Sequence, residues 1–186
     1  MKTPFEHFKT DTTVVQIEEN LYEGNLSDRW SIGKTPNGGY TMALAAKAIS
    51  ESLNHNDPLV ITANYLNRLD FGKVLVSVEV LPFTKSLSSA RATMLQDDEI
   101  KVIFTATFTD FLKTKGLNKS FRQEPAFVDY EDCIFHPFKE GFNPGLEKFI
   151  EKRYCPDSVW WEEKKRGKPN KALFGLPFFF SSHHTE

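Results

Sequence analysis

Apolar and polar positions along the chain follow two periods, and the change between them near Gly39 sets the predicted elements. Residues 12–26 are rich in β-forming residues and have a Gly-Asn pair near their end, so we predict a strand or a pair of strands there. From Gly39 onward the apolar spacing is helical, and the helix should end before Pro58, which cannot continue it. One helical face would carry Met42, Ala46, Ile49 and Leu53, and the other faces are nearly as apolar, with Leu44, Ala45 and Ala48. The helix is therefore expected to be buried.

Period-two patterns dominate the next part of the chain and predict four strands. These strands are expected at residues 59–69, 73–81, 86–96 and 99–111. One face of the second strand would carry Val74, Val76, Val78 and Val80, and one face of the last would carry Ile100, Val102, Phe104, Ala106 and Phe108. The connections are too short for parallel crossovers, so we predict an antiparallel meander with the helix lying across it. The fold class is α+β.

The pattern weakens beyond residue 111. Residues 112–142 are interpreted as a linker. The segment 143–154 predicts a short helix, with Asn143 as its cap and Pro144 at its first position. One more strand is predicted at 158–162, and no second helix or meander follows it.

Composition and charge narrow the class of protein. A chain of 186 residues that is 40% apolar can bury a core in one domain, or in one domain and a fragment. A net charge of −2 and a pI near 6.2 argue against a nucleic-acid-binding surface. Cys133 and Cys155 are too few for a disulfide framework or a metal site, and no run is long enough to span a membrane. Without an apolar signal segment either, we expect a cytoplasmic protein with no cofactor.

The motif PNGGY at 36–40 carries the strongest chemical signal. If Gly38 and Gly39 open the helix, their N–H groups have no acceptor within the helix, and the missing side chains let a ligand approach them. A carbonyl oxygen or an anion would be held there by hydrogen bonds and by the positive end of the helix dipole. The alternative is structural: Gly38 turns the chain and Gly39 packs against the sheet.

The order of motifs resembles a known family. The sequences WSIGKTPNGGYTMALAAKAI, DPLVITANYLNR, GKVLVSVEVL and SLSSARATMLQ are similar to the first repeat of the double-hotdog thioesterase-like family related to acyl-CoA thioesterase II. The resemblance covers residues 13–111. It implies a hotdog domain at 12–111, in which a long antiparallel sheet wraps around a central helix, followed by the linker and by a partial second repeat or irregular tail at 143–186.

The resemblance also implies a site for a fatty acyl thioester such as acyl-CoA. Its catalytic groups would be Asn37 and the N–H groups of Gly38, Gly39 and Tyr40, which would polarise the thioester carbonyl. Met42 and Ile49 would line the acyl crevice. The remaining substrate-binding residues would be Asn64, where relatives often carry a His, Arg68, which would meet a phosphate of CoA, and Gln96, which matches a strand ending of the family. Arg68 as an exposed strand-end residue and Gln96 as a solvated edge residue stay as alternatives.

The sequence departs from the family where a water-activating group is needed. Simpler hotdog thioesterases carry a helix carboxylate about two turns after the glycines, where this chain has Ala46 and Lys47. The first carboxylate of the helix is Glu51, near its far end. We therefore predict an acyl-CoA thioesterase-like protein, and keep as alternatives a non-catalytic acyl-thioester binding module and a truncated product of a double-hotdog gene. A lone hotdog leaves a sheet edge open, so a homo-oligomer is expected.

Overall fold

The chain divides into two compact units. The computed structural model describes residues 3–116, 119, 128–156, 159 and 172–175. Residues 7–116 form one unit, and residues 1–6 with 117–186 form the other. The first unit spans the predicted domain at 12–111; the division of the remainder into linker and second repeat stays a prediction. Within the described part of the chain, no helix is long and apolar enough to cross a membrane.

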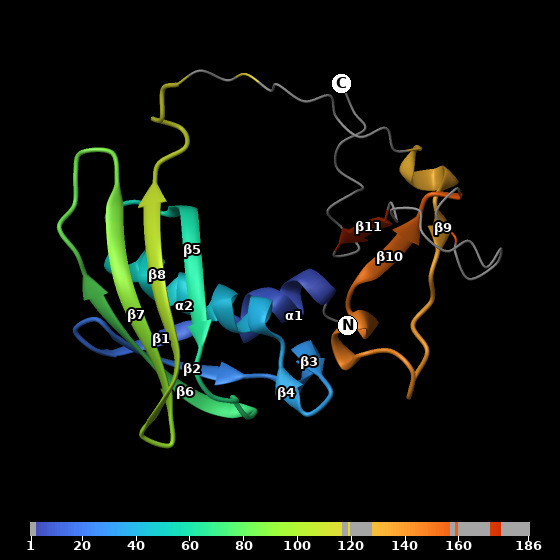
Figure 1. Ribbon diagram of the computed structural model, residues 1–186, viewed down its shortest axis with the longest axis horizontal. Coiled ribbons are helices and arrows are strands. Elements are labelled where there is room, and N and C mark those ends of the chain that lie inside the picture. The colour runs from blue at the N-terminus through green and yellow to red at the C-terminus, as the bar shows by residue number, and fades with distance from the viewer. Residues whose placement is uncertain (1–2, 117–118, 120–127, 157–158, 160–171, 176–186) are drawn as a thin grey trace. The chain divides into compact units, whose positions relative to one another are not determined.

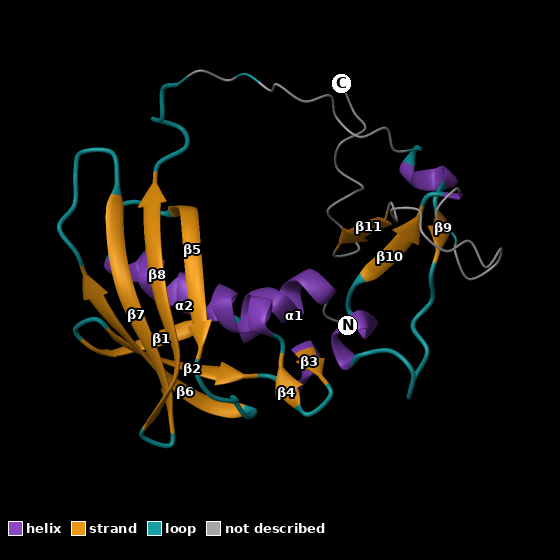
Figure 2. Cartoon of the chain, in the orientation of Figure 1, coloured by secondary structure: helices purple, strands orange, loops and turns teal. Residues whose placement is uncertain are grey.

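A six-stranded antiparallel sheet and one long helix make up the unit 7–116 (Figure 1). The strands are β1 (Val14–Glu18), β2 (Leu21–Leu26), β5 (Asp57–Tyr65), β6 (Gly72–Val80), β7 (Ser88–Gln96) and β8 (Glu99–Thr109), in the order β1-β2-β6-β7-β8-β5. Helix α2 (Gly38–Ser52) lies along the inner side of the curved sheet and contacts all six strands (Figure 2). The short elements η1 (Asp28–Trp30), β3 (Ser31–Ile32) and β4 (Thr35–Pro36) lead into α2, and α1 (Pro4–Asp11) precedes β1. The predicted α+β class is confirmed.

The strand order corrects part of the predicted meander. Strands β6, β7 and β8 are consecutive neighbours, as predicted, and residues 12–26 form a strand pair that turns at Asn20, whose φ is 57°. Strand β5, however, lies at the edge of the sheet, and among the described strands its partner is β8 alone. The N–H groups of Leu66 and Asn67 both bond to the carbonyl oxygen of Lys101, so the chain follows β8 beyond the end of β5 before it crosses to β6.

The buried face of α2 also differs from the predicted one. Its buried residues are Tyr40, Thr41, Leu44, Ala45, Ala48 and Ile49, whereas Met42, Ala46 and Leu53 are partly exposed. Alanines on the buried face let the helix approach the sheet closely. Leu44 packs tightly against β2: a Cβ at Gly24 would lie 2.9 Å from both Leu44 Cδ atoms. The strand faces were predicted better, since Val74, Val76 and Val78 are buried, although Val80 and Ile100 at the ends are exposed.

The second unit contains a small antiparallel sheet in the order β11-β10-β9. Its strands are β9 (Ile134–Phe135), β10 (Glu151–Tyr154) and β11 (Ala172–Gly175), with the 3-10 turns η2 (Tyr130–Asp132) and η3 (Gly145–Lys148). Of the helix predicted at 143–154, only the 3-10 turn η3 forms: Asn143 Oδ1 accepts the N–H of Lys139 instead of capping a helix, Pro144 takes the cap position, and the end of the segment pairs as β10. The segment predicted as a linker contains η2 and β9. The strand predicted at 158–162 lies, except for Val159, outside the described residues.

Candidate functional site

Asn37 starts helix α2 and caps it. Its backbone is extended (φ −63°, ψ 138°), and its Oδ1 accepts the N–H of Tyr40 at 3.1 Å. Its carbonyl oxygen accepts the N–H of Thr41 at 3.0 Å. This is the usual chemistry of an Asn N-cap. It engages Asn37 Oδ1 and the Tyr40 N–H within the helix, so neither of these two groups is left for a ligand, whereas the cap leaves the side-chain NH₂ of Asn37 as a donor.

The N–H groups of Gly38 and Gly39 are the donors that the cap leaves over. They occupy the first two positions of α2, where no acceptor exists within the helix. Among the described residues, none accepts a hydrogen bond from either group. Two adjacent donors thus lie at the positive end of a helix of 15 residues. They can bind a carbonyl oxygen or an oxyanion.

A cavity of about 590 Å³ opens at this end of the helix. It is lined by Thr35, Pro36, Gly38, Thr41, Tyr65, Leu66, Asn67, Arg68 and Leu69. The lining comes from the start of α2, from β4 before it, and from the end of β5 and the segment that follows it. Its volume lies in the range of small-ligand sites.

Tyr65 fixes the peptide group between Gly38 and Gly39. Its hydroxyl donates to the Gly38 carbonyl oxygen at 2.6 Å, and the Gly39 N–H belongs to the same peptide plane. A hydrogen bond to the carbonyl polarises the peptide and strengthens its N–H as a donor. Burial raises the pKa of Tyr65 above its usual value, so the hydroxyl keeps its proton at neutral pH.

Both glycines have little room for a side chain. A Cβ at Gly38 would lie 2.9 Å from the Tyr65 hydroxyl oxygen, and one at Gly39 would lie 3.1 Å from Asn37 Oδ1. The structural reading of the motif, in which the glycines are needed for packing, therefore has a basis in contacts to Tyr65 and to the cap. The missing side chains leave Gly39 exposed and Gly38 half-buried, and of these two glycines Gly38 is the one that lines the cavity.

The structure brings one of the predicted substrate-binding residues to the cavity. Arg68 lines it, and its guanidinium donates to the Lys34 carbonyl oxygen at 2.7 Å and lies 3.4 Å from Asp70 in an exposed ion pair. Asn64 is exposed on the opposite face of β5 from Tyr65, as strand alternation requires. Ile49 is fully buried in the core and Met42 is partly exposed, and neither lines this cavity.

Gln96 is a structural residue of the fold. It is buried, its Oε1 accepts the N–H of Asp70 at 2.8 Å, and its Nε2 donates to the carbonyl oxygens of Asp70 at 3.1 Å and Lys73 at 3.3 Å. Because its amide is satisfied by the backbone, it holds the start of β6 and has no group to offer a substrate. Neither predicted reading of Gln96 describes this role.

Among the described residues, the lining offers no group that would activate water. None of the nine lining residues is a carboxylate or a histidine. Glu51 pairs with Lys47 in the last turns of α2, away from the glycines. Over the described ranges, 3–116, 128–156 and the shorter pieces, no group of three or more His, Cys, Asp or Glu residues could hold a metal ion.

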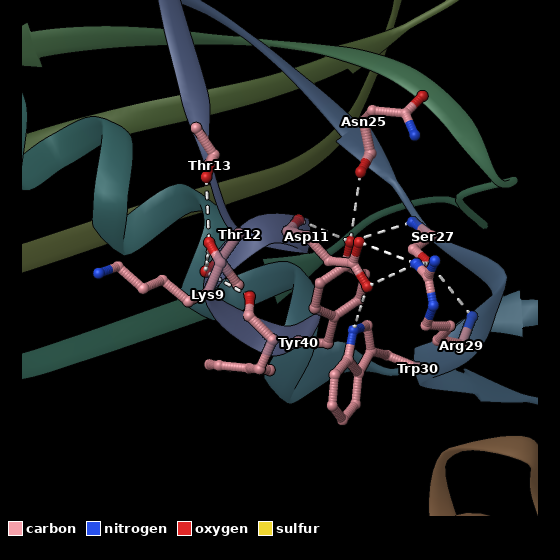
Figure 3. Close-up of polar contacts among 10 residues, drawn as sticks. Lys9, Asp11, Thr12, Thr13, Asn25, Ser27, Arg29, Trp30 and Tyr40 are labelled. Atoms are coloured by element: carbon pink, nitrogen blue, oxygen red, sulfur yellow. Dashed lines mark hydrogen bonds and ion pairs between the residues drawn. The ribbon is translucent and has the colours of Figure 1, made fainter. Parts of the chain in front are cut away.

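A polar cluster that the sequence did not reveal anchors the start of α2 (Figure 3). The Asp11 carboxylate accepts from the Arg29 guanidinium at 3.0 Å and from the indole N–H of Trp30 at 2.9 Å. The Tyr40 hydroxyl donates to the Asp11 carbonyl oxygen at 2.9 Å and accepts the N–H of Ser27 at 3.0 Å. The last residue of PNGGY thus ties α2 to the chain before it. Sequence patterns gave no signal for this, because the partners are 13 to 29 residues away.

Tyr40 should make the stability of this unit sensitive to alkaline pH. Burial raises the pKa of Tyr40 from 10.0 to about 12, so its stabilising contribution is complete below pH 10 and is lost as the pH rises toward 12. Tyr40→Phe should lower the free energy of unfolding at pH 7 by about 1–2 kcal/mol, because the Ser27 N–H loses its acceptor. Urea unfolding between pH 7 and 11 should then show a shallower alkaline decline in the variant. An equal decline in both proteins would contradict this assignment.

Comparison with known proteins agrees with this architecture. Residues 26–109 match the family model of the acyl-CoA thioesterase N-terminal domain. This match covers 84 of the 186 residues, and this part of the chain is similar to the thioesterase-like family. An aligned segment of 92 residues is 33% identical to the thioesterase-like protein TwmA of Talaromyces wortmannii. The aligned segment covers 48% of this chain and 26% of TwmA.

Solved structures show the same fold. A protein assigned as a thioesterase II from Thermobifida fusca YX superposes with a TM-score of 0.79 at 19% identity, over 89% of this chain and 61% of that one. A hotdog protein from Alicyclobacillus acidocaldarius superposes with a TM-score of 0.70 at 18% identity, over 80% of this chain and 55% of that one. Acyl-CoA thioesterase II of Mycobacterium marinum superposes with a TM-score of 0.66 at 15% identity, over 91% of this chain and 60% of that one. The chain thus spans less than two thirds of each relative, and at these identities the structures establish the hotdog fold alone.

Proposed function

We propose that this protein binds a fatty acyl thioester such as acyl-CoA, with the thioester carbonyl oxygen on the N–H groups of Gly38 and Gly39, and that it acts as an acyl-CoA thioesterase. One observation carries the proposal: two adjacent N–H groups without an acceptor among the described residues begin a long buried helix beside a cavity. The thioesterase-like family supports acyl thioester binding or hydrolysis as the type of activity.

The chemistry follows from where charge develops. In the bound ester the two donors polarise the carbonyl, and when water attacks the carbonyl carbon they stabilise the oxyanion, where preorganised donors act most strongly. The helix dipole adds to this effect. The Tyr65 hydroxyl supports it indirectly, because it holds the Gly38–Gly39 peptide in place.

The rest of the ligand would use the cavity and its rim. Pro36, Leu66 and Leu69 give the lining apolar surface for part of the acyl chain. Arg68 is exposed at the rim, where a phosphate of CoA would compete with Asp70 for its guanidinium. Asn64, Met42, Ile49 and Gln96 are left out of this proposed site for the reasons given above.

A second function, acyl-thioester binding without hydrolysis, is favoured by one specific observation. The described lining contains no carboxylate and no imidazole to take a proton from water. Turnover therefore requires a water-activating group from outside this lining. A second copy of the chain is one source, in line with the homo-oligomer predicted from the open sheet edge.

Binding and turnover should be measured on the purified full chain with a panel of short to long acyl-CoAs. Calorimetry gives the affinity, and chromatography of released CoA gives turnover without interference from the protein's own thiols. Binding with CoA release would establish a thioesterase, and binding without release would establish the binding module. A thioether analogue with CH₂ in place of the carbonyl should bind about tenfold more weakly, because two hydrogen bonds are lost. If no acyl-CoA bound, or if the analogue bound equally well, the proposal would be wrong.

A further inference from the structure

The two cysteines of the chain occupy facing positions at the ends of two neighbouring strands. Strands β9 and β10 are antiparallel, with Phe135 opposite Arg153 and Ile134 opposite Tyr154. One step further along this register places Cys133 opposite Cys155. Both are free and buried, at 5% and 2% exposure.

The hydrogen-bond phase of the strand pair sets their separation. The N–H of His136 bonds to the carbonyl oxygen of Lys152 at 2.9 Å, so these two residues form a hydrogen-bonded pair. Because such pairs alternate with non-hydrogen-bonded ones, the facing cysteines fall at a non-hydrogen-bonded position three steps away. Cα atoms at that kind of position are about 4.5 Å apart and the side chains lie close together. A disulfide can bridge that distance.

The backbone around Cys133 is held in place by Tyr130 of η2 and Arg153 of β10. The Cys133 N–H bonds to the Tyr130 carbonyl oxygen at 3.2 Å, and its own carbonyl oxygen accepts from the Arg153 guanidinium at 3.3 Å. The same guanidinium lies over the Tyr130 ring, 4.2 Å from its centroid. Arg153 therefore fixes the turn before β9 against the strand that leads to Cys155. The two sulfur atoms can meet without a movement of the main chain.

We propose that Cys133 and Cys155 are a site of reversible oxidation, at which a disulfide oxidant such as oxidised glutathione converts the two thiols into one disulfide across β9 and β10. One protein thiolate attacks the oxidant, forms a mixed disulfide and releases the first glutathione. The other protein thiolate then attacks the protein sulfur of that mixed disulfide and releases the second. Two protein thiols are oxidised, one glutathione disulfide is reduced to two thiols, and the two protons of the protein thiols end on the released glutathione.

The disulfide would stabilise a unit whose described sheet, β11-β10-β9, is small. Its strands β9, β10 and β11 are short, and short strands alone give little stability. A link from 133 to 155 would close the loop that contains η3, and it would limit the freedom of the unfolded chain. Burial raises the pKa of the Cys133 thiol, which keeps the attacking thiolate scarce at neutral pH, so equilibration needs long incubation.

The full chain should be equilibrated in glutathione buffers from reducing to oxidising, alkylated after denaturation, and weighed intact. We expect two alkyl groups in the reduced protein, and none in an oxidised monomer that is lighter by two hydrogens. Trypsin should release residues 123–139 joined to residues 154–164. Cys133→Ser should carry one alkyl group or one glutathione and form no internal bridge, and Cys155→Ser should behave alike. Three results would each overturn the proposal: two free thiols in every glutathione buffer, glutathione on both cysteines, or disulfides only between chains.

Discussion

Gly39→Val should weaken acyl-CoA binding by about tenfold or more and reduce any hydrolysis by about a hundredfold, the cost of losing an oxyanion donor. The added Cβ would lie 3.1 Å from Asn37 Oδ1, so the cap must shift, and the two methyl groups would stand beside the N–H that is proposed to receive the carbonyl. The helix should survive, because loss of an N-cap costs only about 1 kcal/mol. Calorimetry with the best acyl-CoA of the panel, together with CoA release, measures both effects.

The chain offers a matched control for this substitution. Gly116 belongs to the same compact unit, and a Cβ placed on it would meet no atom within 4 Å. Gly116→Val should therefore keep the affinity within about twofold, the range of substitutions far from a site. Circular dichroism of both variants shows whether they fold. If Gly39→Val folded and bound acyl-CoA like the wild-type protein, the helix N-terminus would not be the site.

The candidate site could be predicted only in part, because its donors are local and its neighbours are not. PNGGY predicted that Gly38 and Gly39 open the helix, and the structure places both at its first two positions. Asn37 is a favoured N-cap residue, so its commitment to the Tyr40 N–H could have been anticipated from capping chemistry alone. The contact of Tyr65 with Gly38 could not be anticipated. Strand alternation tells on which face of β5 the Tyr65 side chain lies, but it does not tell that this face meets the first turn of α2.

The fold shows a similar limit. Hydrophobic periodicity predicted where α2 and the strands of the main sheet lie, because the period depends only on local geometry. The neighbours of β5 depend on where six residues after it run, and the two bonds to the Lys101 carbonyl oxygen that direct this segment are tertiary contacts. For α2, apolar residues on nearly every face left the buried face undetermined. Contacts with the sheet, such as that of Leu44 with Gly24, select it.

The contact between Leu44 and Gly24 should be the most sensitive point of the helix–sheet packing. Leu44 is fully buried, so Leu44→Ala should lower the free energy of unfolding of the unit 7–116 by about 3 kcal/mol. Gly24→Ala should cost about 1–3 kcal/mol on its own, because its Cβ would lie 2.9 Å from both Leu44 Cδ atoms. Hydrogen exchange of peptides from α2 measures these changes within this unit.

The double variant separates this contact from general damage to the core. Once Leu44 is an alanine, the added methyl at position 24 has no Cδ atoms to meet and fills part of the cavity that Leu44 leaves. The loss in free energy of unfolding of the double variant should therefore be smaller than the sum of the two single losses, by about 1 kcal/mol or more. Strict additivity would mean that the sheet relaxes around Gly24 and that the contact does not set the position of α2. A coupled result would show that one strand glycine and one helix leucine hold the helix whose first two N–H groups form the proposed site.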